Sequence, residues 1–105
     1  MAVIEREARI VNPLGMHARP AAELVKVAGR FRCKVDVRKD DLTVNGKSIM
    51  GVMMLAAERG SSIFFRTEGE DAEACMEALV ALAADGFHEM HLTGSEADEA
   101  AEEAG

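Results

Sequence analysis

The sequence predicts a two-layer α+β sandwich, and three observations lead to this prediction. Segments with the two-residue alternation of strands and segments with the apolar spacing of helices follow one another in the order βαββαβα. Each segment has about a dozen residues or fewer, and turn residues separate it from the next. A chain of 105 residues with 49% hydrophobic content fits one domain with one modest core. Short mixed elements of this kind bury their apolar faces by stacking helices on a sheet.

The first strand and the first helix flank a turn. Residues 3–11 alternate between apolar and polar side chains, as in a half-buried strand. Asn12-Pro-Leu-Gly15 has the composition of a turn, and residues 18–28 carry an apolar stripe at helical spacing. Pro20 is compatible with this helix because the N–H groups of a first turn have no acceptor within the helix. Gly29 is expected to end the helix.

A hairpin and a short helix come next. Residues 32–38 alternate again, Lys39-Asp-Asp41 is a polar turn, and residues 42–44 continue as a third strand. Ser48 is a suitable N-cap for a helix over residues 49–57.

The last predicted elements are a strand and the clearest helix of the chain. Residues 62–68 alternate as a fourth strand, and residues 71–84 repeat apolar side chains at helical spacing after an acidic first turn. Gly86 is expected to stop this helix. We assign residues 1–91 to the domain and expect the Ala- and Glu-rich residues 92–105 to form a disordered or loosely helical tail.

The charge distribution excludes some functions. The net charge is −7, and six acidic residues lie between Glu89 and the end of the chain, where there is no Lys or Arg. The rest of the chain is nearly neutral and has no basic stripe, and the sequence contains no Trp or Tyr, so nucleic acid is not an expected partner. No apolar run could span a bilayer and the N-terminus lacks a signal-peptide pattern, so we expect a cytoplasmic protein without membrane insertion.

Cysteine and histidine spacing gives no metal site. Cys33 and Cys75 form no CxxC pattern, and we expect both to be small core residues without a disulfide. His88 and His91 follow the last helix without acidic or cysteine ligands at diagnostic spacing, and we expect both to be exposed to solvent.

The segment Asn12-Pro-Leu-Gly-Met-His-Ala-Arg-Pro-Ala21 carries the strongest indication of chemistry. It places His17 at the start of the predicted helix, where unpaired N–H groups and the helix dipole favour an anion. Arg19 adds donors suited to phosphate, and a neutral imidazole is a good nucleophile. These residues together indicate a histidine that accepts and holds a phosphoryl group.

This segment closely resembles the active-site signature of the HPr family, the histidine-containing phosphocarriers of the sugar phosphotransferase system. Asn45-Gly-Lys-Ser-Ile-Met-Gly-Val-Met53 resembles the family's second signature, around a regulatory serine. The similarity covers about residues 3–88. The resemblance implies an HPr-like fold with helices on one face of a four-stranded antiparallel sheet of strand order 1-4-2-3.

The resemblance also implies roles around the histidine. His17 would be phosphorylated on Nδ1, and Arg19 would stabilise the transferring group, with the backbone N–H groups of Ala18 and Arg19 facing its oxygens. Asn12 and Gly15 would shape the preceding turn without doing chemistry. Pro20 would fix the first helical turn.

Ser48 has two compatible roles. As an N-cap it stabilises the second helix, by about 0.5–2 kcal/mol for such residues. The resemblance also implies that a dedicated HPr kinase/phosphorylase phosphorylates this serine, with an effect on partner binding more than on fold.

The short second helix carries more apolar residues than one buried stripe needs. The excess predicts an exposed apolar patch for partners, although core packing is the alternative from sequence alone. The resemblance implies a docking patch at positions Met16, Ile49, Met50 and Met53.

The implied function is that of a stoichiometric, monomeric phosphocarrier without cofactor or metal. It would accept a phosphoryl group from phospho-enzyme I on His17 and pass it to enzyme IIA domains. One alternative is a nitrogen-type regulatory phosphocarrier, and another is a regulatory protein that binds a transcriptional regulator through Ser48. A nucleotide-binding enzyme using Gly46-Lys-Ser48 is disfavoured, because a phosphate-binding loop needs glycine where this chain has Asp41.

Overall fold

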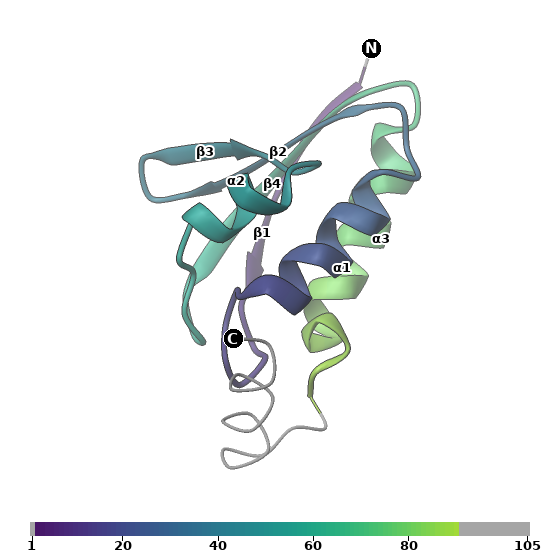
Figure 1. Ribbon diagram of the computed structural model, residues 1–105. Helices are drawn as coiled ribbons and strands as arrows, with labels where there is room; N and C mark the ends of the chain where they lie inside the picture. Colours follow the sequence, from purple (N-terminus) through teal and green to yellow (C-terminus); the bar gives the residue numbers. More distant parts are fainter. Residues whose placement is uncertain (1, 91–105) are drawn as a thin grey trace.

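The computed structural model describes residues 2–90, and it has the predicted two-layer α+β architecture. Strands β1 (Ala2–Arg9), β2 (Lys34–Lys39), β3 (Leu42–Asn45) and β4 (Ser62–Gly69) form one antiparallel sheet of order β1-β4-β2-β3. Helices α1 (Ala18–Ala28), α2 (Ile49–Met54) and α3 (Ala72–Ala84) cover one face of it (Figure 1). A short turn, η1 (Gly86–His88), follows α3.

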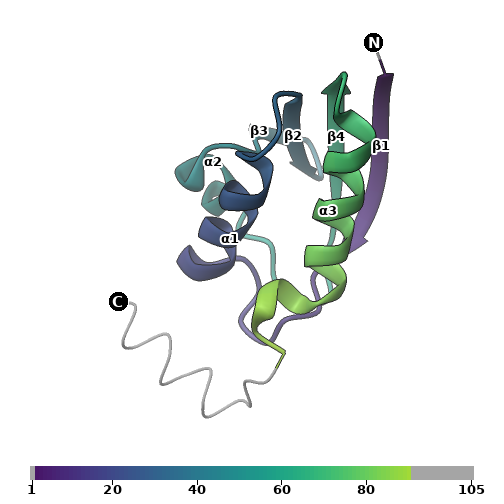
Figure 2. The same cartoon turned by 90° about the vertical axis from the view of Figure 1, so that its right-hand side faces the viewer.

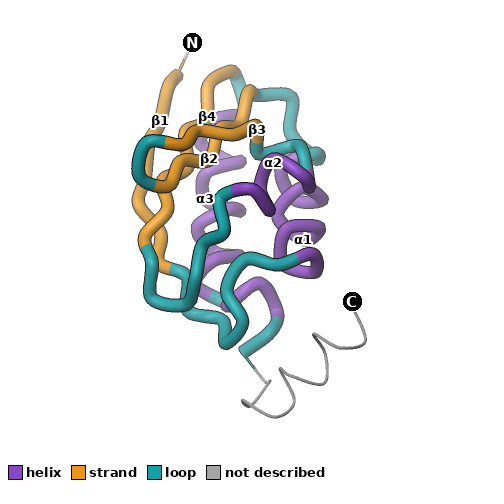
Figure 3. Tube along the Cα trace, turned by 60° about the vertical axis from the view of Figure 1, so that its left-hand side comes forward, coloured by secondary structure: helices purple, strands orange, loops and turns teal. Residues whose placement is uncertain are grey.

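The register of the sheet places its apolar residues towards the helices. In the central strand β4, Ile63, Phe65 and Thr67 are buried, while their neighbours along the strand are half-buried. Val37 of β2 lies opposite Phe65, and both are fully buried. The core therefore fills the space between the sheet and the helices, which Figure 3 shows as an orange layer of strands beside a purple layer of helices.

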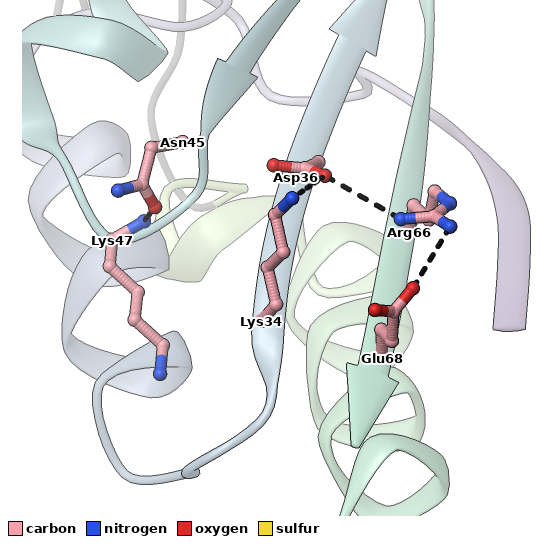
Figure 4. A network of polar contacts seen from close by, with 6 residues as sticks. All are labelled: Lys34, Asp36, Asn45, Lys47, Arg66 and Glu68. Atoms are coloured by element: carbon pink, nitrogen blue, oxygen red, sulfur yellow. Dashed lines mark hydrogen bonds and ion pairs between the residues drawn. The ribbon is translucent and has the colours of Figure 1, made fainter. Parts of the chain in front are cut away.

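The other face of the sheet is open and charged. Arg66 pairs with Asp36 at 3.8 Å and with Glu68 at 3.0 Å, and Lys34 lies 3.9 Å from Asp36 (Figure 4). Arg38 stacks 4.3 Å above the ring of Phe64. These partly exposed pairs contribute little stability each, but they keep this face polar.

Most element boundaries agree with the sequence prediction. Helix α1 has the predicted bounds, and β2 and β3 form the predicted hairpin. Helix α2 was predicted to reach residue 57 but ends at Met54. The chain cannot continue as a helix there, because Ala56 has a left-handed φ of 48°. The predicted tail, residues 92–105, and His91 lie outside the described residues.

The ends of two helices meet at one edge of the molecule. The chain enters α1 beside the place where α3 ends and η1 begins, as both Figure 1 and Figure 2 show. Residues from the first and the last parts of the domain therefore lie next to each other at the start of α1. No helix in the described part of the chain is long and apolar enough to cross a membrane.

Candidate functional site

His17 is the N-cap residue of α1. Its backbone is extended (φ −119°, ψ −166°), and its carbonyl oxygen accepts the N–H of Ala21 at 3.0 Å. The imidazole makes no capping hydrogen bond to the helix, and 24% of the side chain is exposed. The ring therefore lies beside the positive end of α1 while remaining reachable from solvent.

The turn before His17 is closed by Asn12 and Gly15. The N–H of Gly15 donates to the carbonyl oxygen of Asn12 at 3.1 Å, and Asn12 Nδ2 donates to the carbonyl oxygen of Gly15 at 2.8 Å. Gly15 has a φ of 70°, and a Cβ there would lie 2.6 Å from the carbonyl oxygen of Ala57. Only glycine fits this close approach, so the predicted turn-shaping role of both residues agrees with the geometry.

Glu89 completes the site, although no local pattern in the sequence points to it. Its Oε1 lies 3.1 Å from His17 Nε2 and accepts from Asn12 Nδ2 at 3.3 Å. Only 1% of Glu89 is exposed, so the carboxylate reaches the imidazole from the protein interior. A carboxylate buried against a ring nitrogen favours the tautomer with its proton on that nitrogen.

Three consecutive left-handed residues bring Glu89 to this position. Gly86, Phe87 and His88 have φ values of 67°, 54° and 66°, and the N–H of Glu89 donates to the Gly86 carbonyl oxygen at 3.0 Å. Phe87 is fully buried and anchors the turn. Left-handed backbone at non-glycine residues is uncommon and concentrates at functional sites. The only local sequence signal near Glu89 is Gly86 before an apolar residue. Gly86 predicts that the helix ends there, but it does not predict the turn that brings Glu89 to His17.

The arrangement leaves one ring nitrogen available for chemistry. With its proton on Nε2 and directed at Glu89, the neutral imidazole carries its lone pair on Nδ1. Arg19 is exposed two residues further on, within the first turn of α1, and Ala18 is exposed as well. Pro20 lies in that same turn and is buried.

Ser48 caps α2, as predicted. Its Oγ accepts the N–H of Gly51 at 3.1 Å, and its own N–H donates to the carbonyl oxygen of Asn45. Asn45 Oδ1 accepts the backbone N–H of Lys47 at 2.9 Å, and Lys47 Nζ donates to the carbonyl oxygen of Phe31 at 2.7 Å. Figure 4 shows the side chains of Asn45 and Lys47 on this loop. The loop before α2 is thus fixed on both sides of Ser48.

Helix α2 exposes an apolar patch. Ile49 and Met53 are about two-fifths exposed, at 42% and 41%, and Met50 and Met54 are more so, at 76% and 67%. We call these four residues the α2 patch. Met16 does not join it: its side chain is only 6% exposed and belongs to the hydrophobic core. The expectation that Met16 offers docking surface is therefore wrong for its side chain.

The cysteines and His88 lie where the sequence predicts, in the core and at the surface respectively. Cys33 and Cys75 are free thiols buried in the core. His88 is exposed and lies 2.6 Å from Asp85 Oδ2.

Comparisons with known proteins agree with this fold and sequence pattern. Residues 4–85 match the family model described as the PTS HPr component phosphorylation site. The phosphocarrier protein HPr of Pseudomonas putida is 53% identical over 85 residues, which cover 80% of this chain and 94% of that protein. HPr of Cupriavidus necator is 45% identical, with 83% of this chain and 98% of that protein covered. The crystal structure of HPr from Bacillus anthracis has 44% sequence identity and a TM-score of 0.75, and the match covers 79% of this chain and 99% of that one.

The fold and the matches define a phosphocarrier. The chain belongs to the HPr family of the phosphotransferase system. Its role is to carry a phosphoryl group within that system, not to act as a catalytic enzyme. The predicted fold, with strand order 1-4-2-3, and the predicted family are both confirmed.

Proposed function

We propose that His17 is the phosphoryl acceptor of this phosphocarrier and that the phosphoryl group is held on Nδ1. The observation that carries the proposal is the bond between His17 Nε2 and the buried Glu89 carboxylate, at 3.1 Å. The Nδ1 lone pair attacks the phosphorus of phospho-enzyme I, and the bond between phosphorus and enzyme I breaks as the new P–N bond forms. Transfer to an enzyme IIA domain is the same step with the carrier as donor.

The start of α1 stabilises the transferred group. The backbone N–H groups of Ala18 and Arg19 lie in the first turn, where helical N–H groups have no partner within the helix. An anion at such a position gains about 0.3–1 kcal/mol from the helix dipole alone. The exposed guanidinium of Arg19 adds charge-assisted donors, so it would neutralise the phosphoryl oxygens during transfer.

Partner proteins dock on the α2 patch. Three of its four side chains are flexible methionines, which suits a surface that has to bind enzyme I and structurally different enzyme IIA domains in turn. Enzyme I and enzyme IIA are partners of the HPr family, and the carrier acts with them as a monomer in the cytoplasm.

The proposal is tested by incubating the purified chain with enzyme I, phosphoenolpyruvate and Mg²⁺. Intact mass should show one acid-labile phosphoryl group on the wild type and none on His17→Ala. His88→Asn is the control, since Asn tolerates the left-handed backbone at this exposed position. Labelling that persists in His17→Ala would overturn the assignment.

A second proposal concerns regulation at Ser48. The serine lies at the start of α2, next to the α2 patch, so a phosphate there would add negative charge at the docking surface. HPr kinase/phosphorylase with ATP should then place an acid-stable phosphoryl group on the wild type and on His17→Ala. Ser48→Ala should carry no such group. A phosphoryl group on that variant would contradict the assignment to Ser48. Binding of a transcriptional regulator would follow from the same modification.

A further inference from the structure

Strand β1 forms one edge of the sheet, and its outer side pairs with no other strand of residues 2–90. The N–H of Ile10, just after the strand, donates to the carbonyl oxygen of Ser61 at 2.9 Å, so the even-numbered residues of β1 direct their backbone groups towards β4. The backbone groups that point away from the sheet therefore belong to the odd-numbered residues Val3, Glu5, Glu7 and Arg9. An open edge of eight residues offers hydrogen-bond donors and acceptors to a further strand.

A groove lies beside this edge, between β1 and α3, two elements that Figure 2 shows side by side. Its apolar lining includes Ile4 of β1 and Met76 and Val80 of α3. Its volume is about 330 Å³, at the lower end of the range of about 300–1,000 Å³ that ligand pockets span. The groove therefore has room for a few side chains but not for a large ligand.

The charge along this edge is mainly negative. Among the described residues, Glu7 of β1 and Glu73 and Glu77 beside the groove are exposed and take part in no ion pair. Glu5 is also exposed, and its Oε1 lies 3.7 Å from Arg38 Nη2. The basic residues of the strand and the groove are Arg6 and Arg9. Carboxylates outnumber guanidinium groups here, so the edge favours a basic partner.

We propose that β1 and this groove bind an extended segment of a partner protein in which Lys or Arg alternates with apolar residues. The segment adds to β1 as an antiparallel strand and bonds to its outward backbone groups. Its apolar side chains face α3 and enter the groove, on the same side of the sheet as Ile4 and the buried Ala8. Its basic side chains lie on the open face of the sheet, opposite Glu5 and Glu7.

Two other occupants match this edge less well. A second copy of β1, paired antiparallel about Arg6, would place Arg6 opposite Arg6 and Glu5 opposite Glu7. Like charges directly opposite each other destabilise a sheet. Residues 91–105 of the same chain contain five acidic residues and no Lys or Arg, so they would bring like charge to Glu73 and Glu77.

The test titrates the full-length ¹⁵N-labelled protein with the capped peptide Lys-Val-Lys-Leu-Lys-Val-Lys and follows the amide NMR signals. The expected result is saturable binding with signal changes along β1 and α3 and slower hydrogen exchange at the N–H groups of Val3, Glu5 and Glu7. The peptide's Lys N–H groups face β1 in the antiparallel pairing, because directly opposite residues share a face. Methylation of the Lys backbone nitrogens should therefore abolish binding, whereas methylation of the Val and Leu nitrogens should leave it intact.

Matched peptides and variants test the groove and the charge. Binding should be lost in Lys-Thr-Lys-Thr-Lys-Thr-Lys, which lacks apolar groups, and in Glu-Val-Glu-Leu-Glu-Val-Glu, which has the wrong charge. Glu7→Gln should raise the dissociation constant about two- to fivefold, the effect of one cross-strand charge pair. Glu58→Gln, at an exposed acid outside the sheet and the groove, should leave it unchanged.

Four results would overturn the proposal. These are no binding of the first peptide, equal affinity for its Lys-methylated form, signal changes centred on the α2 patch, and dimerisation of the protein through β1 in the absence of peptide.

Discussion

Glu89 Oε1 lies 3.1 Å from His17 Nε2, although the two residues are 72 positions apart in sequence. The carboxylate is buried, while the ring itself is partly exposed. One ring nitrogen is therefore held by the protein, and Nδ1 is left as the nitrogen on which phosphoryl transfer is proposed. This relationship connects the turn after α3 to the start of α1, where phosphoryl transfer is proposed.

Replacing Glu89 by Ala should change the tautomer of His17. A hydrogen bond to a charged group contributes about 1.5–3 kcal/mol, so its loss should shift the ratio of the two neutral tautomers by about tenfold or more. The ¹⁵N chemical shifts of the imidazole measure this ratio. We expect the Nε2–H form to dominate in the wild type, and phosphorylation by enzyme I to slow in the variant.

Glu77→Ala is the control for this variant, because Glu77 is an exposed acid on α3 and its loss changes the net charge equally. Identical tautomer ratios in Glu89→Ala and the wild type would show that the carboxylate does not position the ring.

Gly15→Ala should destabilise the fold. The new Cβ would lie 2.6 Å from the backbone oxygen of Ala57 at a φ of 70°, so both strain and steric overlap oppose it. Left-handed strain of this kind costs about 1–3 kcal/mol before the steric overlap is counted.

Urea denaturation should show that the free energy of unfolding of Gly15→Ala is lower than that of the wild type by at least this amount. Gly60→Ala is the control, because no atom lies within 4 Å of its new Cβ, and its free energy of unfolding should fall by less. Equal losses in the two variants would contradict the role of the close approach.

Asp71 should make stability depend on pH in acid. The N–H groups of Arg32 and Cys33 donate to its carboxylate and hold its pKa below the usual 3.8. A carboxylate whose pKa is lower in the folded state stabilises the protein above the unfolded pKa, and this contribution disappears as the pH falls through the folded value.

Asp71→Asn should therefore be less stable than the wild type at neutral pH, and the difference should shrink as the pH falls below about 4. Urea titrations over a series of pH values measure this difference. A difference that stays constant across the acid range would show that the charge of Asp71 is not what stabilises this contact.

Met50→Ala should weaken binding to enzyme I. Met50 is the most exposed residue of the α2 patch, at 76%, and removing a central contact from such a patch costs about 1–2 kcal/mol. The dissociation constant should rise about tenfold by calorimetry, with the unfolding midpoint almost unchanged. Leu42→Ala, an exposed apolar residue on β3, should bind normally. Equal affinities for all three proteins would place the docking surface elsewhere.

Local patterns were sufficient to predict much of this molecule. The bounds of α1 followed from the turn before His17, the apolar stripe and Gly29, which act over a few residues. Ser48 was recognisable as a cap because capping depends on residue type and position alone.

The parts that the sequence did not reveal depend on contacts between distant segments. Glu89 was counted only as one acid among six, because its burial follows from the left-handed turn at Gly86–His88 and from Phe87 filling the core. Met16 was expected to offer docking surface, but its side chain packs into the core next to the close approach of Gly15 to Ala57. Helix α2 ended earlier than predicted, because the chain leaves helical backbone at Ala56, which has a left-handed φ of 48°.

The most direct measurement is the NMR spectrum of the ¹⁵N-labelled chain after phosphorylation by enzyme I. Coupling between phosphorus and the ring nitrogens identifies both the residue and the atom that carries the phosphoryl group. We predict coupling to Nδ1 of His17, with the proton retained on Nε2 beside Glu89. A phosphoryl group on Nε2 of His17, or on another residue, would contradict the proposed site.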